Sequence, residues 1–359
     1  PSGKLPRGES HMLNLHKPYI DKIVLSDSKG GDMHIIGDVF DCWFESGSMP
    51  YAELHYPFEN KNIFDNNFPA DFIAEGMDQT RGWFYSLINL GVGLLDKAPF
   101  KNVIVNGIVL AGDGQKMSKS LKNYTDPMLL VEKFGADAIR FALMNSPVMR
   151  GESVAFGDEV VEEVYKKNVQ RMENVLGFYL MYRSAKYDKE ANANSTNVID
   201  IWILSRLNEV INSSIKGYNN YELDIAVSGV SQFVDDLSTW YLRRSRDRLK
   251  DLDAEALQTI GHVLVEFAKV IAPAMPFLAE QIYQEVVEGG NSVHLQSYPL
   301  SKDVDNAAID DMRIVREVVT SLLMIRQKNN LPVRQPLLSA TINKNISQKY
   351  FDIIADEVN

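Results

Sequence analysis

The 359-residue sequence contains a single cysteine and only six histidines. One cysteine excludes an internal disulfide framework and a cysteine-rich zinc site. The histidines are scattered without metal-ligand spacing, so we expect no metal ion held by protein side chains. Cys42 lies between Asp41 and Trp43. We expect it to be a small buried residue, and a free thiol fits the reducing cytoplasm that we predict as its compartment.

Long apolar runs are also missing. No stretch approaches the roughly 20 apolar residues that cross a bilayer, and the chain does not open on a signal-peptide pattern, so we expect no membrane association. The sequence has 37 basic and 48 acidic residues, a formal charge of −11. Such an acidic body does not coat nucleic acid through bulk charge, so any RNA must bind at local basic patches.

The first part of the chain alternates short β-type runs with helical periodicity. Residues 1–12 resemble the remnant of a cleavable tag, although they fit a native segment too, and are left out of the fold prediction. Two β-type runs within residues 22–36 flank Ser28-Lys29-Gly30-Gly31 and predict a hairpin. A buried strand at 71–74, a helix at 81–95 and a strand at 102–110 then predict a crossover and a parallel sheet.

Helical patterns dominate the remainder. Asp126-Pro127 is an N-cap followed by proline, which predicts a helix to about residue 134 and a second one over 136–144. Apolar residues then recur with a 3.6-residue period and predict an antiparallel helical bundle, with helices at 158–182, 200–215, 223–249, 254–272, 276–288 and 308–328. A β-type run covers 338–342, and both ends of the chain look like cuts through a larger protein. The predicted fold class is α/β followed by all-α.

The most specific motif is a loop with two lysines three residues apart. The string Asp113-Gly114-Gln115-Lys116-Met117-Ser118-Lys119-Ser120 follows a predicted strand. Two ammonium groups on such a loop close over a polyphosphate and stabilise the charge of a leaving pyrophosphate. The competing interpretation is a solvated basic turn, which is the usual meaning of an isolated Lys-x-x-Lys.

The full string Lys-Met-Ser-Lys-Ser after a strand resembles the second signature of the class I aminoacyl-tRNA synthetases. That resemblance implies ATP contacts from Lys116, Met117, Ser118, Lys119, Asn106 and Gly107. The two lysines hold the phosphates during adenylate formation, and Mg²⁺ accompanies the ATP. Attack of an amino-acid carboxylate on the α-phosphorus needs positioning and charge stabilisation but no protein nucleophile.

Two further strings narrow the resemblance to the isoleucine-type enzymes, in their eukaryotic-like branch. The stretch from Asp38 to Ser48 resembles their Trp-Phe-x-Ser-Gly motif, and the stretch from Ala74 to Phe84 resembles the strand-to-helix turn that faces the amino-acid pocket. Valine and leucine enzymes carry different residues at 78–83. The resemblance implies that isoleucine and its adenylate are bound by Trp43, Glu75, Gly76, Asp78, Gln79 and Trp83.

The chemistry of these side chains agrees with an aliphatic substrate. Such a substrate is recognised by shape, and the rigid indole rings of Trp43 and Trp83 suit a pocket wall. Glu75 and Asp78 offer carboxylates to the substrate ammonium, and Gln79 offers a hydrogen bond. A lone Trp-Phe pair is more often core packing, but charged residues and glycines at predicted strand ends favour a ligand site. Rejecting valine rests on one methylene, so we expect an editing site elsewhere.

The helical half resembles the anticodon-binding domain of the same family at 236–248, which implies tRNA(Ile) as a partner. Helical spacing places Arg243, Arg246 and Lys250 opposite the apolar face. This position fits a solvated stripe and a stripe that contacts the tRNA backbone equally well. Arg244 and Arg248 project with the apolar face, so we expect them to pair with acids of the bundle or the domain junction in preference to RNA.

A second match to this domain covers residues 324–337. Its basic residues are Arg326, Lys328 and Arg334. We take them as a further candidate surface for RNA or for the domain junction.

One signature of the family is missing. Class I synthetases need a His-x-Gly-His string, and this sequence has none. The resemblance divides the chain into a hairpin segment returning from a missing editing insertion (1–37), the C-terminal half of a Rossmann-like catalytic domain (38–157), an anticodon-binding domain (158–332) and the start of a junction region (333–359). Half of the ATP site is absent, so we predict that the chain does not form adenylate by itself. We also predict that it is a monomer.

Two other functions stay open. One is a fragment of a valine-type class I synthetase. The other is a non-catalytic tRNA-binding module derived from a synthetase, in which the lysine loop and the tryptophan pocket are relics.

Overall fold

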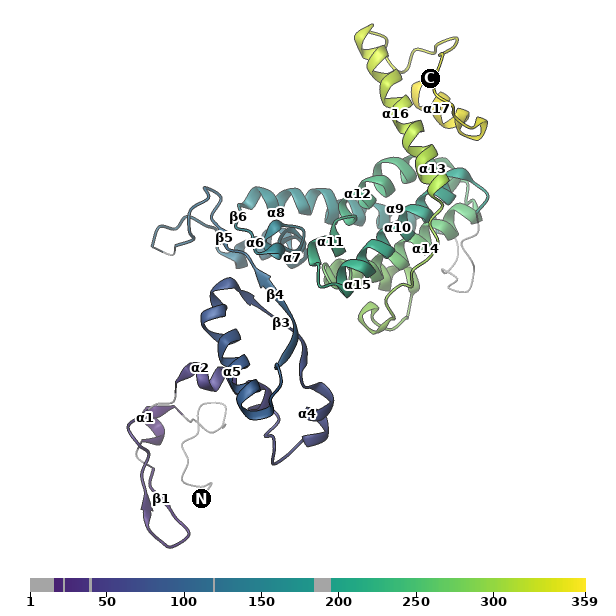
Figure 1. Cartoon of the computed structure of the whole chain (residues 1–359). Coiled ribbons are helices and arrows are strands. Elements are labelled where there is room, and N and C mark those ends of the chain that lie inside the picture. The colour runs from purple at the N-terminus through teal and green to yellow at the C-terminus, as the bar shows by residue number, and fades with distance from the viewer. Residues whose placement is uncertain (1–15, 22, 39–40, 119, 184–194) are drawn as a thin grey trace. The chain divides into compact units, whose positions relative to one another are not determined.

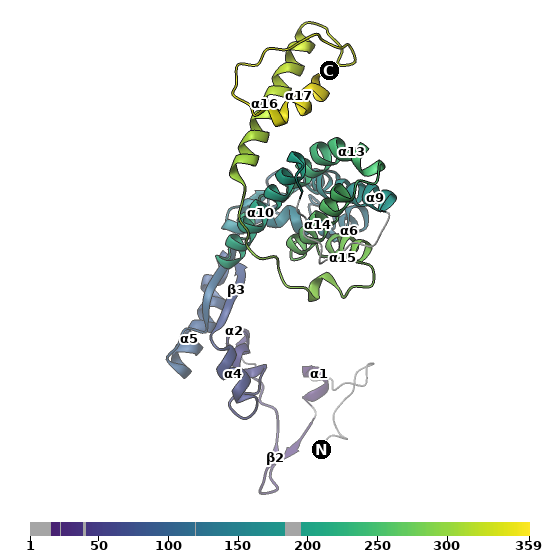
Figure 2. The same cartoon turned by 90° about the vertical axis from the view of Figure 1, so that its right-hand side faces the viewer.

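The computed structural model describes residues 16–21, 23–38, 41–118, 120–183 and 195–359. The chain divides into two compact units, residues 1–73 with 78–103 and residues 74–77 with 104–359. Figures 1 and 2 label the elements of both. Among the described residues, no helix is long and apolar enough to cross a membrane.

The first unit opens with the short helix α1 (Lys17–Ile20) and a hairpin. Strand β1 (Leu25–Ser26) pairs antiparallel with β2 (Asp32–Met33). The Asp27 carboxylate accepts hydrogen bonds from the backbone N–H groups of Lys29 and Gly31 at 2.7 Å each, which closes the turn. Gly30 has φ +83°, a conformation that favours glycine. The predicted hairpin is confirmed.

Three short helices follow: α2 (Cys42–Gly47), α3 (Met49–Ala52) and α4 (Lys61–Asn67). The Asp41 carboxylate caps α2 by accepting from the backbone N–H of Trp43 at 2.6 Å. Cys42 is exposed, so its predicted burial is wrong. It occupies the first turn of a six-residue helix whose only buried residue is Gly47, at the other end.

A strand, a helix and a strand then follow in the predicted order. These are β3 (Ala70–Gly76), α5 (Trp83–Leu95) and β4 (Phe100–Asn106), and β3 and β4 are hydrogen-bonded neighbours. The expected strand at 102–110 is divided by Gly107 into β4 and β5 (Val109–Leu110). The predicted burial of β3 is wrong, because only Ile73 is buried in this strand.

The strands do not form one sheet. Strand β5 pairs in parallel with β6 (Val154–Ala155), with Val109 opposite Val154. In the described part of the chain there are three sheets of two strands each, rather than the single parallel sheet expected. Helices α6 (Pro127–Phe134) and α7 (Ala136–Met144) stand where they were predicted. The Asp126 carboxylate caps α6 by accepting from Met128 N at 2.8 Å.

The remainder is helical, so the prediction of an α/β part followed by a helical part is confirmed. Its α-helices include α8 (Asp158–Val164), α9 (Gln170–Tyr182), α10 (Val198–Asn219), α11 (Leu223–Val227), α12 (Val230–Asp235), α13 (Leu242–Lys250), α14 (Ala254–Ile271), α15 (Pro276–Val287) and α16 (Asn306–Lys328). One π-helical turn joins α8 to α9 and another joins α12 to α13. Large side chains such as Trp202, Phe233 and Tyr241 fill the core between these helices.

Helices α6–α8 group with this bundle and not with the first unit. The Asp137 carboxylate accepts from the backbone N–H of Leu278 at 2.7 Å, at the start of α15. Arg140 donates to the carbonyl of Pro273 at 2.8 Å. Helix α7 therefore holds the turn between α14 and α15 through these two side chains. Burial raises the pKa of the Asp137 carboxyl above its usual value.

The last element is α17 (Phe351–Val358), which packs against α16 (Figure 2). The β-type run at 338–342 forms no strand, so that prediction is wrong. Alternating apolar residues stabilise a strand only where a neighbouring strand accepts its backbone hydrogen bonds. Among the described residues no strand lies beside this segment.

Candidate functional site

The lysine loop begins as a tight turn directly after β5. Leu110 and Lys116 form an antiparallel bridge, and Gly114 N donates to Ala111 O at 2.8 Å across the turn. Gly114 has φ +79°, which explains the glycine at this position. The Lys116 side chain is exposed, and its ammonium has no ion pair with any described residue. It is thus available to an anionic ligand.

Asn123 ties the two halves of this loop together. Its carboxamide oxygen accepts from Ser118 N at 2.9 Å, and its Nδ2 donates to Lys116 O at 3.2 Å. The Ser118 hydroxyl lies 2.8 Å from that of Ser120. Lys119, the second lysine of the motif, lies outside the described residues. The sequence analysis missed Asn123, although asparagine is common where a side chain must hold a turn.

Asn106 and Gly107 lie between β4 and β5. A Cβ at Gly107 would stand 1.8 Å from the carbonyl oxygen of Glu152. Gly107 N donates to Val148 O at 2.8 Å. The glycine is therefore required by the chain itself, and no nucleotide is needed to explain the close approach.

The two tryptophans predicted for the amino-acid pocket come together at α2 and the start of α5. The Trp83 indole N–H donates to Ser46 O at 3.0 Å, which fixes the ring against α2. A Cβ at Gly82 would lie 2.8 Å from the edge of the Trp43 ring. Trp83 is half-buried, and Trp43 is exposed over part of its surface.

The polar residues predicted for the same pocket divide into two groups. Glu75 and Asp78 are exposed carboxylates at the end of β3 and in the 3-10 turn after it. The Gln79 side chain is already engaged. Its Oε1 accepts from Trp83 N at 2.9 Å, and its Nε2 donates to Asp78 Oδ2 at 3.3 Å. Gly76 is the last residue of β3.

Helix α13 carries the arginines predicted for the helical half, and two of them pair with α17. The Glu357 carboxylate lies 2.6 Å from Arg243 Nη2 and 2.7 Å from Arg244 Nη1, and Asp356 lies 2.9 Å from Arg244 Nη2. The pairing predicted for Arg244 is confirmed. Arg243 is paired too, although its side chain stays 54% exposed.

Arg248 confirms the second predicted ion pair. Its Nη1 and Nη2 each lie 2.9 Å from an oxygen of the fully buried Asp200 carboxylate, and its Nε lies 3.0 Å from Asp253. Tyr241 donates to Asp200 as well, at 3.0 Å. Burial lowers the pKa of Arg248, but the carboxylates of Asp200 and Asp253 more than offset this and hold it above its usual range.

The prediction for Arg326 is wrong. This residue was predicted to face RNA or the domain junction, but it is only 2% exposed. Its Nη2 donates to the carbonyls of Val333 and Gln335 and to Asn359 O. Because residues 329–337 turn back over the end of α16, this guanidinium holds a loop and does not reach the surface.

The other basic candidates are exposed. Arg246 lies 5.6 Å from the centre of the Phe178 ring, and Lys250 pairs with Asp247 at 3.3 Å. Lys328 and Arg334 are exposed at the end of α16 and in the loop after it. These four remain available to an anionic partner.

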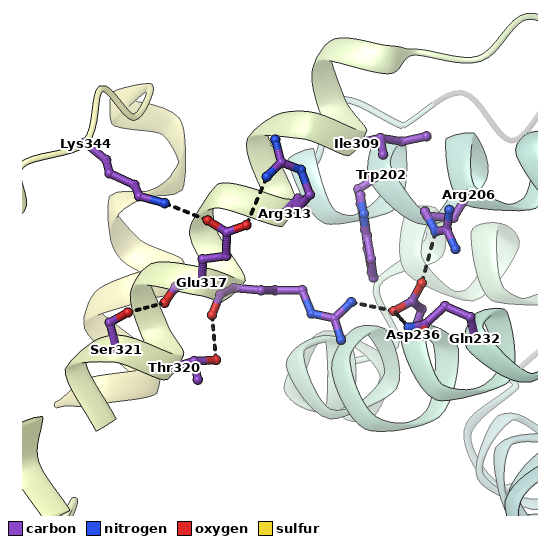
Figure 3. Close-up of a pocket in the computed structure, with 11 residues that line it drawn as sticks. Trp202, Arg206, Gln232, Asp236, Ile309, Arg313, Glu317, Thr320, Ser321 and Lys344 are labelled. Carbon is purple, nitrogen blue, oxygen red and sulfur yellow. Dashed lines mark hydrogen bonds and ion pairs between the residues drawn. The ribbon is translucent and has the colours of Figure 1, made fainter. Parts of the chain in front are cut away.

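A cavity of about 680 Å³ lies between α10, the π-helical turn that joins α12 to α13, and α16 (Figure 3). None of the predicted site residues lines it. The buried Asp236 carboxylate accepts from Arg206 Nε at 3.0 Å and is also paired with Arg316. On the opposite wall, Glu317 lies 2.9 Å from Arg313 and 2.6 Å from Lys344. Every cation of this cavity thus has a carboxylate partner.

No group of three or more His, Cys, Asp or Glu side chains is arranged to hold a metal ion in the described part of the chain.

Two domain families match the chain. Residues 4–155 match the class I tRNA synthetases (I, L, M and V), and residues 200–342 match the anticodon-binding domain of tRNA ligase. The isoleucine–tRNA ligase of Treponema denticola is 42% identical over 354 residues, which covers 92% of this chain and 32% of that protein. Its counterpart from Chlamydia trachomatis serovar D is 41% identical over 365 residues, covering 97% and 35%. The chain thus spans about a third of the length of these relatives.

Solved structures show the same fold. The Agrobacterium radiobacter K84 LeuRS–tRNA–LeuAMS complex matches with a TM-score of 0.62 at 18% identity, over 82% of this chain and 36% of that chain. Methionyl-tRNA synthetase of Mycobacterium tuberculosis, in complex with methionyl-adenylate, matches with a TM-score of 0.55 at 18% identity, over 74% and 60%. Both domain matches and the identity to these ligases over nearly the whole chain show that it belongs to the class I tRNA synthetases.

Proposed function

We propose that this chain is part of an isoleucine–tRNA ligase, which activates isoleucine with ATP to the adenylate and transfers it to tRNA(Ile). The chain supplies the lysine loop, one wall of the isoleucine pocket and a helical surface for tRNA. Identity of 41–43% to isoleucine–tRNA ligases over at least 92% of the chain supports this choice.

The observation that carries the proposal is the apolar surface that the indole rings of Trp83 and Trp43 present. The only polar atom of the Trp83 side chain is already bonded to Ser46 O, so the ring offers an apolar surface. Trp43 lies across Gly82 and remains partly exposed. The Trp83 ring, whose one polar atom is engaged, favours an aliphatic side chain, since a polar one would lose its hydrogen bonds with water there. We propose the exposed carboxylates of Asp78 and Glu75 as partners of the substrate ammonium.

On the ATP side, we propose that Lys116 and Lys119 bind the phosphates, with Ser118 and Met117 beside them and Asn106-Gly107 near the nucleoside. Mg²⁺ would arrive with the ATP, and we assign it no ligand from this chain. We propose the strands β3–β6 as the C-terminal part of a Rossmann-like domain (38–157), after a hairpin segment (1–37). The anticodon-binding domain (158–332) and the start of a junction region (333–359) follow.

For tRNA, we propose the exposed side of α13 and the end of α16, with Arg243, Arg246, Lys250, Lys328 and Arg334 near its phosphates. Phosphate contacts position the RNA without reading its sequence.

A chimera tests the whole proposal. This chain replaces the matching third of the Treponema denticola ligase, and amino-acid-dependent ATP–pyrophosphate exchange is measured. We expect isoleucine to be preferred over valine by about 10- to 200-fold, the range that one methylene provides. Equal activation of valine would favour the valine-type alternative. A chimera that binds tRNA but exchanges no pyrophosphate would favour the non-catalytic module.

The isolated chain is expected to show no isoleucine-dependent pyrophosphate exchange. Its sequence has no His-x-Gly-His string, so the lysine loop acts on ATP without the other half of the phosphate site. The measurement uses radiolabelled pyrophosphate with the chain alone and the chimera as the positive control. Exchange above background by the chain alone would contradict this prediction.

Removing one charge from α17 is expected to strengthen RNA binding. Glu357 pairs with Arg243 and Arg244, and Arg244 keeps its second partner Asp356, so Glu357→Gln frees Arg243 for phosphates. We expect affinity for a tRNA(Ile) transcript to rise about two- to fivefold, the value of a partly exposed ion pair. The plot of log K against log salt should steepen by about one phosphate contact.

Glu132→Gln is the matched control for this measurement. Glu132 is exposed on α6 and has no ion pair with any described residue, so its loss makes the same change in net charge. An equal gain in both variants would show a bulk-charge effect and exclude specific release of Arg243.

A further inference from the structure

Helix α2 and the start of α5 touch at two glycines. A Cβ at Gly47 would lie 2.8 Å from Ser86 Cβ, and a Cβ at Gly82 would lie 2.8 and 3.0 Å from Cη2 and Cζ3 of Trp43. The two distances of 2.8 Å are shorter than Cβ atoms show, so either added Cβ would force a neighbour to move. The benzene edge of the Trp43 indole thus occupies the space that any side chain at position 82 would fill.

The same few residues hold Trp83. Its indole N–H donates to Ser46 O at 3.0 Å, and its backbone N–H donates to Gln79 Oε1 at 2.9 Å. That oxygen would lie 2.7 Å from a Cβ at Gly82. A side chain at position 82 would therefore displace both the Trp43 ring and the carboxamide that fixes the start of α5.

We propose that Gly82 is a positioning residue for the aliphatic pocket: its bare Cα lets the Trp43 ring and the Gln79 carboxamide pack against the turn that carries Trp83. In this role Gln79 acts through Trp83 rather than on the substrate. The proposal rests on the proposed function, because it assigns the Trp43–Trp83 wall to an aliphatic amino acid. Recognition by shape loses affinity when a wall moves by a fraction of an ångström.

Helix α5 provides a matched control for Gly82→Ala. Gly93 lies in the same helix, and a Cβ there meets nothing within 4 Å. Gly93→Ala thus adds the same methyl group without a contact. A double variant, Trp43→Phe with Gly82→Ala, removes the ring atoms that would collide and keeps only the close contact with Gln79 Oε1.

The first readout needs no ligand. The chain has four tryptophans, so 5-fluorotryptophan labelling gives four fluorine resonances, assigned by single Trp→Phe variants. In Gly82→Ala we expect the Trp43 and Trp83 resonances to shift while those of Trp202 and Trp240 stay in place. Gly93→Ala should leave all four unchanged, and the double variant should return the Trp83 resonance part of the way to its original position. Unchanged Trp43 and Trp83 resonances in Gly82→Ala would overturn the proposal.

The second readout is binding of L-isoleucine, followed by the same resonances. We expect Gly82→Ala to bind about tenfold more weakly than the wild type, with Gly93→Ala unaffected. The double variant should recover part of the loss, and it keeps the test open if Gly82→Ala alone does not fold. Wild-type affinity in Gly82→Ala would overturn the positioning role. Absence of any isoleucine response in the wild type would instead count against the proposed function, and the ligand-free shifts would still decide how Gly82 holds the tryptophans.

Discussion

Lys116→Ala in the chimera is expected to reduce isoleucine-dependent pyrophosphate exchange by about 10²- to 10³-fold, the cost of losing one preorganised charge at a transition state. The ammonium is exposed and has no ion pair with described residues, so its charge is free for the phosphates. The bridge of Lys116 to Leu110 and the hydrogen bond from Asn123 anchor its backbone. Removing the side chain therefore removes charge without loosening the loop.

Lys122→Ala is the control for Lys116→Ala. Lys122 is also exposed, and it lies two residues after Ser120, the last residue of the motif. The same loss of charge at this position should change exchange less than about threefold. Binding of tRNA should stay at wild-type strength in both variants. A Lys116→Ala chimera with normal exchange would exclude the lysine loop from adenylate formation.

Arg248→Met is expected to lower the free energy of unfolding of the helical half by about 3–5 kcal/mol, the cost of leaving a buried charge without its partner. Asp200 is fully buried and would retain only hydroxyl donors, from Tyr241 at 3.0 Å and Ser195 at 2.7 Å. Denaturant unfolding followed through the fluorescence of Trp202 and Trp240 measures this loss.

Two further variants separate the buried charge from other effects of Arg248→Met. In the first, Arg313→Met makes the same substitution in an exposed pair, 59% exposed at the arginine, and should cost at most about 1 kcal/mol. Combining Arg248→Met with Asp200→Asn removes the stranded charge while keeping an acceptor for Tyr241, and should recover part of the stability. Equal losses in Arg248→Met and Arg313→Met would mean that the buried pair is no more important than a surface one.

Where the sequence analysis succeeded, the deciding interactions lie within a few residues of one another. The Asp126 cap and the hairpin turn at Asp27 are examples. The faces of α13 are another, because a helix carries its side chains around its axis in a fixed order. Spacing alone therefore separated Arg244 and Arg248, which point toward acids, from Arg246 and Lys250, which remain exposed.

The failures involve partners outside the helix or strand in question. Arg326 is as basic as Lys328 and close to it in the chain, but its burial depends on residues 329–337 turning back over α16. The charge of Arg243 is offset by a carboxylate 114 residues later. Residues 338–342 have the pattern of a strand, yet a strand also needs a neighbour. Helical or β periodicity carries no information on such contacts between separate segments of the chain.

The amino-acid sequence by itself determined the family, the order of an α/β part and a helical part, and the residue types of the lysine loop and the tryptophan wall. These follow from short motifs and from periodicity, which act through neighbouring residues. Only the tertiary structure decided that Gly82 makes room for Trp43, that Ser46 satisfies the Trp83 indole, and that α17 occupies two of the arginines on α13. Those facts depend on distances between elements, which packing of the whole chain sets and no local pattern encodes.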